Sequence, residues 1–248
     1  MRGIRLIQGD CLEVMNDIPD KSIDMILCDL PYGTTACKWD TIIPFGPLWE
    51  QYNRVIKDNG AIVLTASQPF TSALIMSNPK IFKYNWTWNK KRVTGFLNAK
   101  KQPLKTIEDI CVFYEKQCTY NPQMVEGELH GSWGGSKESI NKREGYGDFK
   151  DRTEGYSSKW YYPKNLLVFT SERGLHPTQK PVPLFEYLIK TYTNECETVL
   201  DNCMGSGTTG IACKNTNRNF IGIELDETYF NIAKERIENH TKQLDIKG

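Results

Sequence analysis

The sequence predicts an α/β fold in which a doubly wound, mostly parallel sheet carries helices on both faces. Short apolar runs of strand length alternate with stretches of helical spacing at both ends of the chain, and such alternation is typical of parallel sheets. A glycine-rich turn at residues 205–210 follows one apolar run and opens a helical stretch. With 248 residues, of which 39% are apolar and 25% charged, the chain can bury one core, or one core and a smaller satellite.

The N-terminal third of the chain alternates strands with helical patterns. Strands are predicted at residues 5–8, 23–28, 61–66 and 82–88. The first leads into a polar turn, Gly9-Asp10-Cys11, and the second ends in Asp29-Leu30-Pro31-Tyr32. A helix between the second and third strands is predicted by the spacing of Leu48, Tyr52, Val55 and Ile56. Asn59-Gly60 is predicted to end that helix.

The middle of the chain has a different character. Residues 126–160 contain seven glycines, many charges and almost no aliphatic side chains, which predicts a long loop or a loosely ordered lobe. Residues 89–164 carry 14 Lys or Arg against 10 Asp or Glu, whereas the net charge of the whole chain is +1. This stretch is therefore the predicted face for a polyanion, although a solvated insert would show the same excess.

The C-terminal third returns to core-like sequence at residues 165–170. A proline-bounded loop at 176–181 then precedes a helix whose apolar positions are Leu184, Leu188 and Tyr192. A strand at 198–201, the glycine-rich turn, a helix to about Lys214, a strand at 220–225 and a final helix follow. These elements extend the same parallel sheet.

Composition narrows the class of protein. The eight cysteines form no CxxC pair and no Cys/His cluster with metal-ligand spacing, so the sequence predicts a reduced, cytoplasmic protein without a bound metal. No apolar run approaches the ~20 residues that cross a bilayer, and no signal peptide is recognised at the start of the chain. We therefore expect no membrane partner.

The glycine-rich turn predicts a nucleotide-type ligand. Gly205, Gly207 and Gly210 satisfy the GxGxxG pattern, and Glu224 lies near the acidic position expected at the end of the next strand. Glycines let the backbone approach a ligand, and a carboxylate accepts both hydroxyls of a ribose. NAD, S-adenosylmethionine and a turn that binds nothing remain open, whereas a P-loop would need a Lys after Gly210. Only 24 residues follow Glu224, so the further strands of the sheet are expected from the N-terminal part. The order of elements is then permuted relative to an ordinary dinucleotide-binding domain, which disfavours NAD.

The segment at residues 29–32 follows a buried strand, at the end where open α/β sheets bind ligands. It can be a simple strand exit, in which Asp29 caps a turn. It also suits methyl transfer to a base amine, because the Asp29 carboxylate and the Leu30 carbonyl can accept the two amino hydrogens and stabilise the developing positive charge. Pro31 restricts Leu30 to extended geometry, and Tyr32 offers a ring for a flipped base. This chemistry needs no cysteine nucleophile.

Together these motifs resemble those of the DNA amino-methyltransferases, in the group whose catalytic motif precedes its cofactor motif. Residues 29–32 resemble the family's (Asp/Asn/Ser)-Pro-Pro-(Tyr/Phe) motif, and residues 201–209 resemble its Asp-Pro-Phe-x-Gly-Ser-Gly-Thr-Thr motif. Weaker similarities lie at residues 9–11, 86–90, 176–181 and 221–225. The resemblance covers roughly residues 1–90 and 165–240, and the sequence departs from the family pattern at Leu30, Asn202 and Cys203.

The resemblance assigns expected roles to particular residues. It makes the catalytic segment Asp29, Leu30, Pro31 and Tyr32. The expected cofactor residues are Asp10, Cys11, Asp29, His176, Thr178, Gln179, Lys180, Asp201, Met204, Gly205, Ser206, Gly207, Thr208, Thr209, Glu224 and Leu225. The expected DNA contacts are Trp39, Lys90, Lys91, Arg92, Lys100 and Lys101. No metal ligand is expected.

The resemblance also implies an architecture and a reaction. It implies a seven-stranded, Rossmann-like methyltransferase sheet in permuted order, with a catalytic domain at 1–90 and 165–248 and a target-recognition region at 91–164. The aromatic residues that suit base stacking in that region are Trp133, Tyr146, Phe149, Tyr156 and Trp160. The implied reaction transfers a methyl group from S-adenosyl-L-methionine to the N6 amine of a flipped adenine in DNA. An N4-cytosine enzyme and a catalytically inactive DNA-binding homologue stay open as alternatives, as do a homodimer and a cognate restriction endonuclease as partners.

Overall fold

The computed structural model describes residues 3–34, 40–132, 156–171 and 179–240. It divides into two compact units, the first formed by residues 1–121 and 165–248 and the second by residues 122–164. The compact second unit thus begins at residue 122, whereas the target-recognition region was expected to begin at residue 91. The difference arises because residues 91–121 include strand residues of the central sheet in the first unit.

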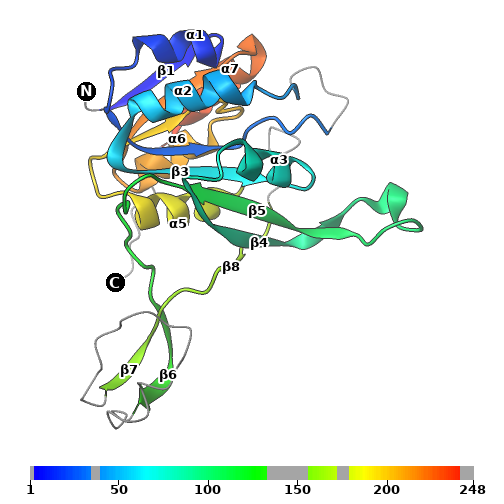
Figure 1. Cartoon of the computed structure of the whole chain (residues 1–248), viewed down its shortest axis with the longest axis vertical. Helices are drawn as coiled ribbons and strands as arrows, with labels where there is room; N and C mark the ends of the chain where they lie inside the picture. The colour runs from blue at the N-terminus through cyan, green and yellow to red at the C-terminus, as the bar shows by residue number, and fades with distance from the viewer. Residues whose placement is uncertain (1–2, 35–39, 133–155, 172–178, 241–248) are drawn as a thin grey trace. The chain divides into compact units, whose positions relative to one another are not determined.

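An eight-stranded sheet forms the framework of the first unit (Figure 1). In spatial order its strands are β1 (Ile4–Gln8), β10 (Asn219–Glu224), β9 (Thr198–Asp201), β2 (Ile23–Cys28), β3 (Ile56–Ala66), β5 (Lys105–Phe113), β4 (Phe82–Thr94) and β8 (Leu166–Val168). Neighbouring strands are parallel except where β5 pairs with β3 and β4, so the predicted doubly wound, mostly parallel sheet is confirmed. The sheet has one strand more than the seven expected, and the short β8 lies at its edge.

Helices cover both faces of this sheet (Figure 1). The helical segments are α1 (Cys11–Val14), η1 (Met15–Asp17), α2 (Phe45–Val55), α3 (Phe70–Ser77), η2 (Phe96–Asn98), α5 (Val182–Tyr192), α6 (Thr208–Asn215) and α7 (Glu227–Asn239). α1, α2 and α3 share a hydrophobic core with Ile26 and Cys28 of β2. α5, α6 and α7 share a second core with Met25 and Leu27 of the same strand. Every residue of β2 is buried, as a central parallel strand covered on both faces requires.

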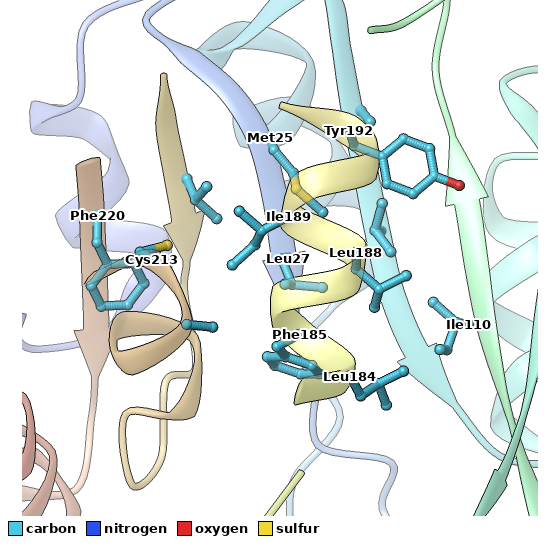
Figure 2. Close-up of a cluster of buried hydrophobic side chains, with 14 of the residues drawn as sticks. Met25, Leu27, Ile110, Leu184, Phe185, Leu188, Ile189, Tyr192, Cys213 and Phe220 are labelled. Carbon is cyan, nitrogen blue, oxygen red and sulfur yellow. The ribbon is translucent and has the colours of Figure 1, made fainter. Parts of the chain in front are cut away.

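The predicted helix after the proline-bounded loop is confirmed as α5. Its apolar residues recur at helical spacing, and the buried ones include Leu184, Phe185, Leu188, Ile189 and Tyr192. Figure 2 shows this side of α5 facing Met25 and Leu27 of β2. Burial of each large apolar side chain contributes about 1.5–3 kcal/mol. This packing fixes the start of α5, and Lys180 lies two residues before that start.

The predicted end of the second helix at Asn59-Gly60 is wrong. α2 ends at Val55, and Asn59 and Gly60 lie within β3. Residues 57–60 form a bulge, because Ile23 of β2 pairs with Ile56 whereas Met25 pairs with Ala61. A Cβ atom at Gly60 would lie 2.8 Å from the Asp24 carbonyl oxygen. The glycine therefore permits a close approach of two strands rather than ending a helix.

β4 and β5 continue past the rest of the sheet as a two-stranded arm, residues 90–106 (Figure 1). β3 ends at Ala66, opposite Asp109 of β5, but pairing of β5 with β4 continues to Lys105 opposite Thr94. β5 is antiparallel to both β3 and β4, so β4 runs in the same direction as β2 and β3. The arm therefore projects from the edge at which β2 and β3 end.

The second unit contains two antiparallel strands, β6 (Val125–Ser132) and β7 (Tyr156–Tyr161). The loop or loosely ordered lobe predicted over residues 126–160 therefore includes a strand pair that the sequence did not indicate. β6 has the sequence Val-Glu-Gly-Glu-Leu-His-Gly-Ser, which lacks the alternation of apolar and polar residues typical of a half-buried strand. Among the expected stacking residues, Trp160 lies on β7 and is 52% exposed. Trp133, Tyr146 and Phe149 lie outside the described residues.

Across the described ranges, no helix has both the length and the apolar character needed to span a membrane. In the same part of the chain, no group of His, Cys, Asp and Glu side chains is arranged to hold a metal ion.

Candidate active site

The candidate site is built from segments that meet at one edge of the sheet. The parallel strands β1, β10, β9 and β2 are successive neighbours. Their carboxyl ends lead to Asp10, Glu224, the glycine-rich turn and Asp29. In open α/β sheets, ligands bind in the crevice outside these strand ends. The structure therefore brings two segments from the N-terminal part of the chain together with two from the C-terminal part.

Asp29 follows β2 and uses both oxygens of its carboxylate. Oδ1 accepts hydrogen bonds from the hydroxyl groups of Tyr32, at 2.7 Å, and Thr65. Oδ2 accepts a hydrogen bond from the Lys180 ammonium at 2.6 Å. A carboxylate offers about four lone-pair sites, so these three contacts leave room for one further donor. Asp29 is thus oriented before any ligand arrives.

Lys180 belongs to a buried chain of alternating charges. Its Nζ lies 2.6 Å from Asp29 Oδ2 and 3.4 Å from Glu108 Oε2. The other oxygen of Glu108 lies 3.1 Å from Lys90 Nζ, and the side chains of Lys180 and Lys90 are only 6% and 9% exposed. Burial by itself lowers the pKa of Lys180, but the carboxylates of Asp29 and Glu108 outweigh burial and raise this pKa. Lys180 is therefore a permanent cation beside Asp29.

Tyr32 supports Asp29 as a neutral donor. Its ring packs against Phe70, with centroids 5.1 Å apart and planes at 27°. The Lys180 ammonium lies 5.6 Å from the centroid of the Tyr32 ring. Burial and the charge of Asp29 raise the pKa of Tyr32 well above its ordinary value, so the hydroxyl keeps its proton.

Two backbone groups that follow Tyr32 are held by Asp40. The backbone N–H groups of Gly33 and Thr34 donate to the Asp40 carboxylate at 2.8 and 2.9 Å. Asp40 is 8% exposed, so these hydrogen bonds are largely shielded from water. Trp39, an expected DNA contact, lies outside the described residues.

The glycine-rich turn leaves space next to its backbone. Gly205 and Gly207 have φ values of +50° and +79°, which favour glycine. A Cβ at Gly207 would lie 2.9 Å from Ile237 of α7, whereas a Cβ at Gly205 would meet no atom within 4 Å. The Arg236 guanidinium of α7 donates to the Ser206 carbonyl at 2.9 Å. α7 thus supports one side of the turn, and the backbone at Gly205 is open to a ligand.

Several expected cofactor residues shape the turn from within. Asp201 is 3% exposed and accepts hydrogen bonds from the Thr209 hydroxyl and from the Cys203 N–H. Burial raises the pKa of Asp201 to about 7. The other buried side chains of the turn are Met204, Ser206 and Thr208. These side chains hold the turn in place, so any ligand contact falls to its exposed backbone.

The departures from the family pattern have local explanations. Asn202, which stands where the pattern has Pro, is 2% exposed and accepts a hydrogen bond from the buried Tyr52 hydroxyl at 2.6 Å. Cys203, which stands where the pattern has Phe, packs against the core that α1, α2 and α3 share with the sheet. Both substitutions keep the turn attached to the protein interior.

Glu224 connects the turn to the end of β10. Its Oε2 accepts the Gly205 N–H at 2.8 Å and its Oε1 accepts the Asp226 N–H at 2.9 Å. Burial raises the pKa of Glu224. Leu225 is 66% exposed beside it, and Asp10, at the end of β1, is also exposed. Glu224 thus lies directly beside Gly205, whereas Cys11 is buried. The cofactor roles expected for these residues stay predictions.

The structure places the other expected residues in different surroundings. Gln179 contacts the turn, since the Ser206 hydroxyl donates to its Oε1 at 3.4 Å. Lys180, expected at the cofactor, pairs with Asp29, and Lys90, expected at DNA, is buried beside Glu108; their ligand contacts stay predictions. The remaining expected cations are exposed on the arm: Lys91, Arg92, Lys100 and Lys101. His176 and Thr178 lie outside the described residues.

Two residues of the site were not anticipated. Thr65 reaches Asp29 from the end of β3, and its sequence context is that of an ordinary buried strand. Glu108 holds Lys180 and Lys90 from β5. The sequence held one signal for Glu108. Two adjacent acidic residues, Glu108 and Asp109, directly precede four buried apolar residues of the same strand.

A permuted parallel sheet, an open glycine-rich turn with an acidic neighbour and an oriented carboxylate beside it define an α/β methyltransferase. The sequence model of a family described as DNA methylase, N6_N4_Mtase, matches residues 23–235. This match spans most of the chain, and the chain belongs to that family. It is therefore a DNA methyltransferase, as the sequence predicted.

Individual relatives agree with this assignment. The Type II methyltransferase M.HpaI of Haemophilus parainfluenzae is 27% identical over 97% of this chain and 76% of its own. The DNA adenine methyltransferase YhdJ of Escherichia coli K12 is 27% identical over 94% of this chain and 82% of its own. The crystal structure of an M1.HpyAVI–SAM complex has a TM-score of 0.63 at 25% identity, covering 94% of this chain and 99% of that one.

Proposed function

We propose that this protein transfers a methyl group from S-adenosyl-L-methionine to the N6 amine of an adenine that has been flipped out of duplex DNA. The observation that carries the proposal is the oriented Asp29 carboxylate, which lies on the strand next to the one that leads into the open glycine-rich turn. This adjacency supports a site in which an acceptor for an amine and a nucleoside cofactor lie side by side.

The residues of the turn fit this cofactor. The open space at Gly205 admits a ligand to the backbone, and the Glu224 carboxylate beside it is an acceptor suited to a ribose hydroxyl. Leu225 follows Glu224, and Asp10 follows the neighbouring strand β1; both are exposed and suit the face and the amine of an adenine ring. When bound, S-adenosyl-L-methionine supplies an electrophilic methyl group on its sulfonium.

Asp29 and Leu30 supply the acceptors for the target amine. The fourth lone-pair site of Asp29 can accept one amino hydrogen, and the Leu30 carbonyl, directed by Pro31, can accept the other. As the amine nitrogen becomes positively charged, both hydrogen bonds strengthen, which is electrostatic stabilisation of the transition state. Tyr32 borders the pocket with its ring, and its hydroxyl holds Asp29 in place.

Adenine is favoured over cytosine by the aspartate at the first position of the catalytic segment and by the named adenine specificity of the relative YhdJ. The N4-cytosine alternative has support from the fold alone. The cytosine-N4-specific PvuII DNA methyltransferase has a TM-score of 0.67 at 14% identity, covering 98% of this chain and 88% of that one.

Analysis of modified nucleosides tests the proposal. The purified protein is incubated with labelled S-adenosyl-L-methionine and unmethylated bacterial DNA, and the DNA is then digested and its methylated nucleosides are identified. We expect N6-methyladenine, formed about 10²-fold more slowly or not at all with Asp29→Ala. N4-methylcytosine as the product would establish the alternative, and cofactor and DNA binding without any methylated nucleoside would indicate an inactive homologue.

The DNA contacts of the proposal lie on the arm and in the second unit. Lys91, Arg92, Lys100 and Lys101 are exposed on the arm, whereas Lys90 is buried. The exposed cations of the arm support the proposal that residues 91–164 form the target-recognition region. Several relatives carry Type II names, which supports a cognate restriction endonuclease as a functional partner.

A further inference from the structure

The tip of the arm exposes large apolar side chains. Phe96 and Leu97 are 65% and 101% exposed, and both lie in η2, the turn that joins the two strands of the arm. Val93 on the arm is 42% exposed. Exposure of two adjacent large apolar side chains to water is unfavourable, so their position at a tip indicates a partner that buries them.

The charge around this tip identifies the chemistry of the partner. Residues 91–105 contain five cations and no Asp or Glu, and the cations Lys91, Arg92, Lys100, Lys101 and Lys105 are all exposed. A purely cationic surface complements a polyanion. A second copy of the chain is disfavoured, because two side chains bury far less than the ~800 Å² per partner of a stable interface.

The arm points toward the place where DNA would lie. Cys28 of β2 pairs with Leu64, which pairs with Cys111 of β5, so Asp29 lies about level with Ile110. From Ile110 to Lys105 the strand advances about 17 Å at ~3.4 Å per residue, and Phe96 and Leu97 lie farther still. B-DNA has a major groove about 12 Å wide and 8.5 Å deep. The tip can therefore reach across a groove when a base occupies the pocket at Asp29.

We propose that Phe96 and Leu97 form a wedge that enters the base stack beside the target nucleotide, while the flanking cations of the arm contact phosphates. An apolar tip has no partner on the phosphate backbone. A thymine methyl in the major groove covers part of one side chain, whereas two adjacent large side chains are fully buried between base steps, where apolar wedges unstack DNA. Unstacking a neighbouring step lowers the free-energy cost of extruding the target base. The proposal rests on DNA as the substrate of the proposed function.

The test separates insertion from phosphate contact. The double variant F96S and L97S is compared with the parent, with the charge variant K91A and R92A, and with M76S. Met76 is a matched control because it is a large apolar residue that is 71% exposed on α3. The DNA is a short duplex that the parent methylates, with 2-aminopurine next to the methylated base, and binding is followed by anisotropy over a range of KCl concentrations.

We expect F96S and L97S to weaken DNA binding by about 10- to 100-fold, the scale of burying one or two large apolar side chains. The salt slope should stay at the parental value, and the rise in 2-aminopurine emission should be lost. K91A and R92A should instead flatten the slope, by up to about 0.9 log units per lost phosphate contact. Phe96→Trp should keep both affinity and emission, because a larger ring also stacks, and M76S should behave as the parent.

Parental affinity and emission in the double variant would overturn the wedge. So would a change in sedimentation without a change in DNA binding, which would assign the tip to self-association. Failure of the parent to methylate any DNA would instead contradict the proposed function, so the two failures are distinguishable. Because both residues are exposed, unchanged thermal unfolding is expected and verifies that the variants fold.

Discussion

The ion pair between Lys180 and Asp29 makes the sharpest prediction about catalysis. Lys180→Met keeps the length and apolar stem of the side chain and removes the ammonium that lies 2.6 Å from Asp29 and 3.4 Å from Glu108. In the variant, the carboxylates of Asp29 and Glu108 flank an uncharged methionine side chain. Glu108 keeps Lys90 as a partner, and Asp29 keeps only the hydroxyls of Tyr32 and Thr65.

The structure sets the size of the effect on stability. Removing one partner of a buried ion pair costs about 3–5 kcal/mol. The side chains of Asp29 and Glu108 are 24% and 16% exposed, so water replaces part of the lost contact, and we expect a loss of about 2–3 kcal/mol in the free energy of unfolding. For a chain of this size the melting temperature should fall by roughly 5–10 °C.

The effect on the reaction separates positioning of Asp29 from stability. Without the ammonium, Asp29 Oδ2 loses the hydrogen bond that fixes it, and the carboxylate can turn away from the target amine. Misplacement of a reacting group by about 1 Å can cost about 10²-fold, so we expect the single-turnover rate to fall by about 10-fold or more. Lys180→Arg keeps the charge and should keep most of the parental rate. A purely structural defect would lower the melting temperature and leave the rate of the folded variant unchanged.

Single-turnover methylation at saturating cofactor and DNA, well below the melting transition of each variant, measures this rate. The control is Lys57→Met, because Lys57 pairs at 2.6 Å with Asp24 near the start of β2 rather than at its carboxyl end. This control should leave the rate unaltered. A folded Lys180→Met protein with the parental rate would refute the pairing role. Weaker binding of S-adenosyl-L-methionine, with an unchanged single-turnover rate at saturating cofactor, would indicate that Lys180 contacts the cofactor.

Three further predictions concern single residues. Asp29→Ala should lower the single-turnover rate by about 10²-fold or more while DNA affinity changes by only ~1 kcal/mol, and a near-parental rate in a folded variant would contradict its catalytic role. Glu224→Ala should weaken cofactor binding by ~1.5–3 kcal/mol, so equal affinities in calorimetry would remove Glu224 from the cofactor site. Burial raises the pKa of Asp201 to about 7, so this group's contribution to stability is present below its unfolded pKa of ~3.9 and is lost as the pH rises through 7. Asp201→Asn has no carboxyl group to titrate. In urea unfolding, the free energy of unfolding of the variant minus that of the parent should therefore increase from pH 4 to pH 8. A difference that stays constant over this range would contradict the prediction.

The sequence predicted the parts of the molecule whose signals are local. The buried strand before Asp29, the glycine-rich turn and the amphipathic α5 each have a pattern that reports one element at a time. The order of these elements along the chain then indicated both the parallel sheet and the family. The departures at Asn202 and Cys203 did not alter this, because both residues attach the turn to the protein interior by contacts of their own.

The sequence could not predict features that depend on strand register. Asn59-Gly60 has the composition of a turn, but the bulge in β3 arises from the close approach of Gly60 to Asp24. The contact of Thr65 with Asp29 likewise requires β2 and β3 to end at the same level. Lys90 was grouped with its exposed neighbours, yet the strand directs it inward to Glu108. Side-chain direction in a strand reverses at every residue, so a basic run does not reveal which cation is buried.

A lone cation beside the catalytic carboxylate would oppose the chemistry, since Asp29 must stabilise an amine that becomes positive. The chain of four charges removes this conflict. Lys180 fixes Oδ2 of Asp29 in a partly buried site, and Glu108, which also contacts Lys180, offsets the positive field of that ammonium at the target nitrogen. Lys90 in turn balances Glu108, so the four groups together are neutral and no uncompensated charge is buried. Because Lys90 and Glu108 lie at the base of the arm, the same network that orients Asp29 also anchors the segment that we propose to act on DNA.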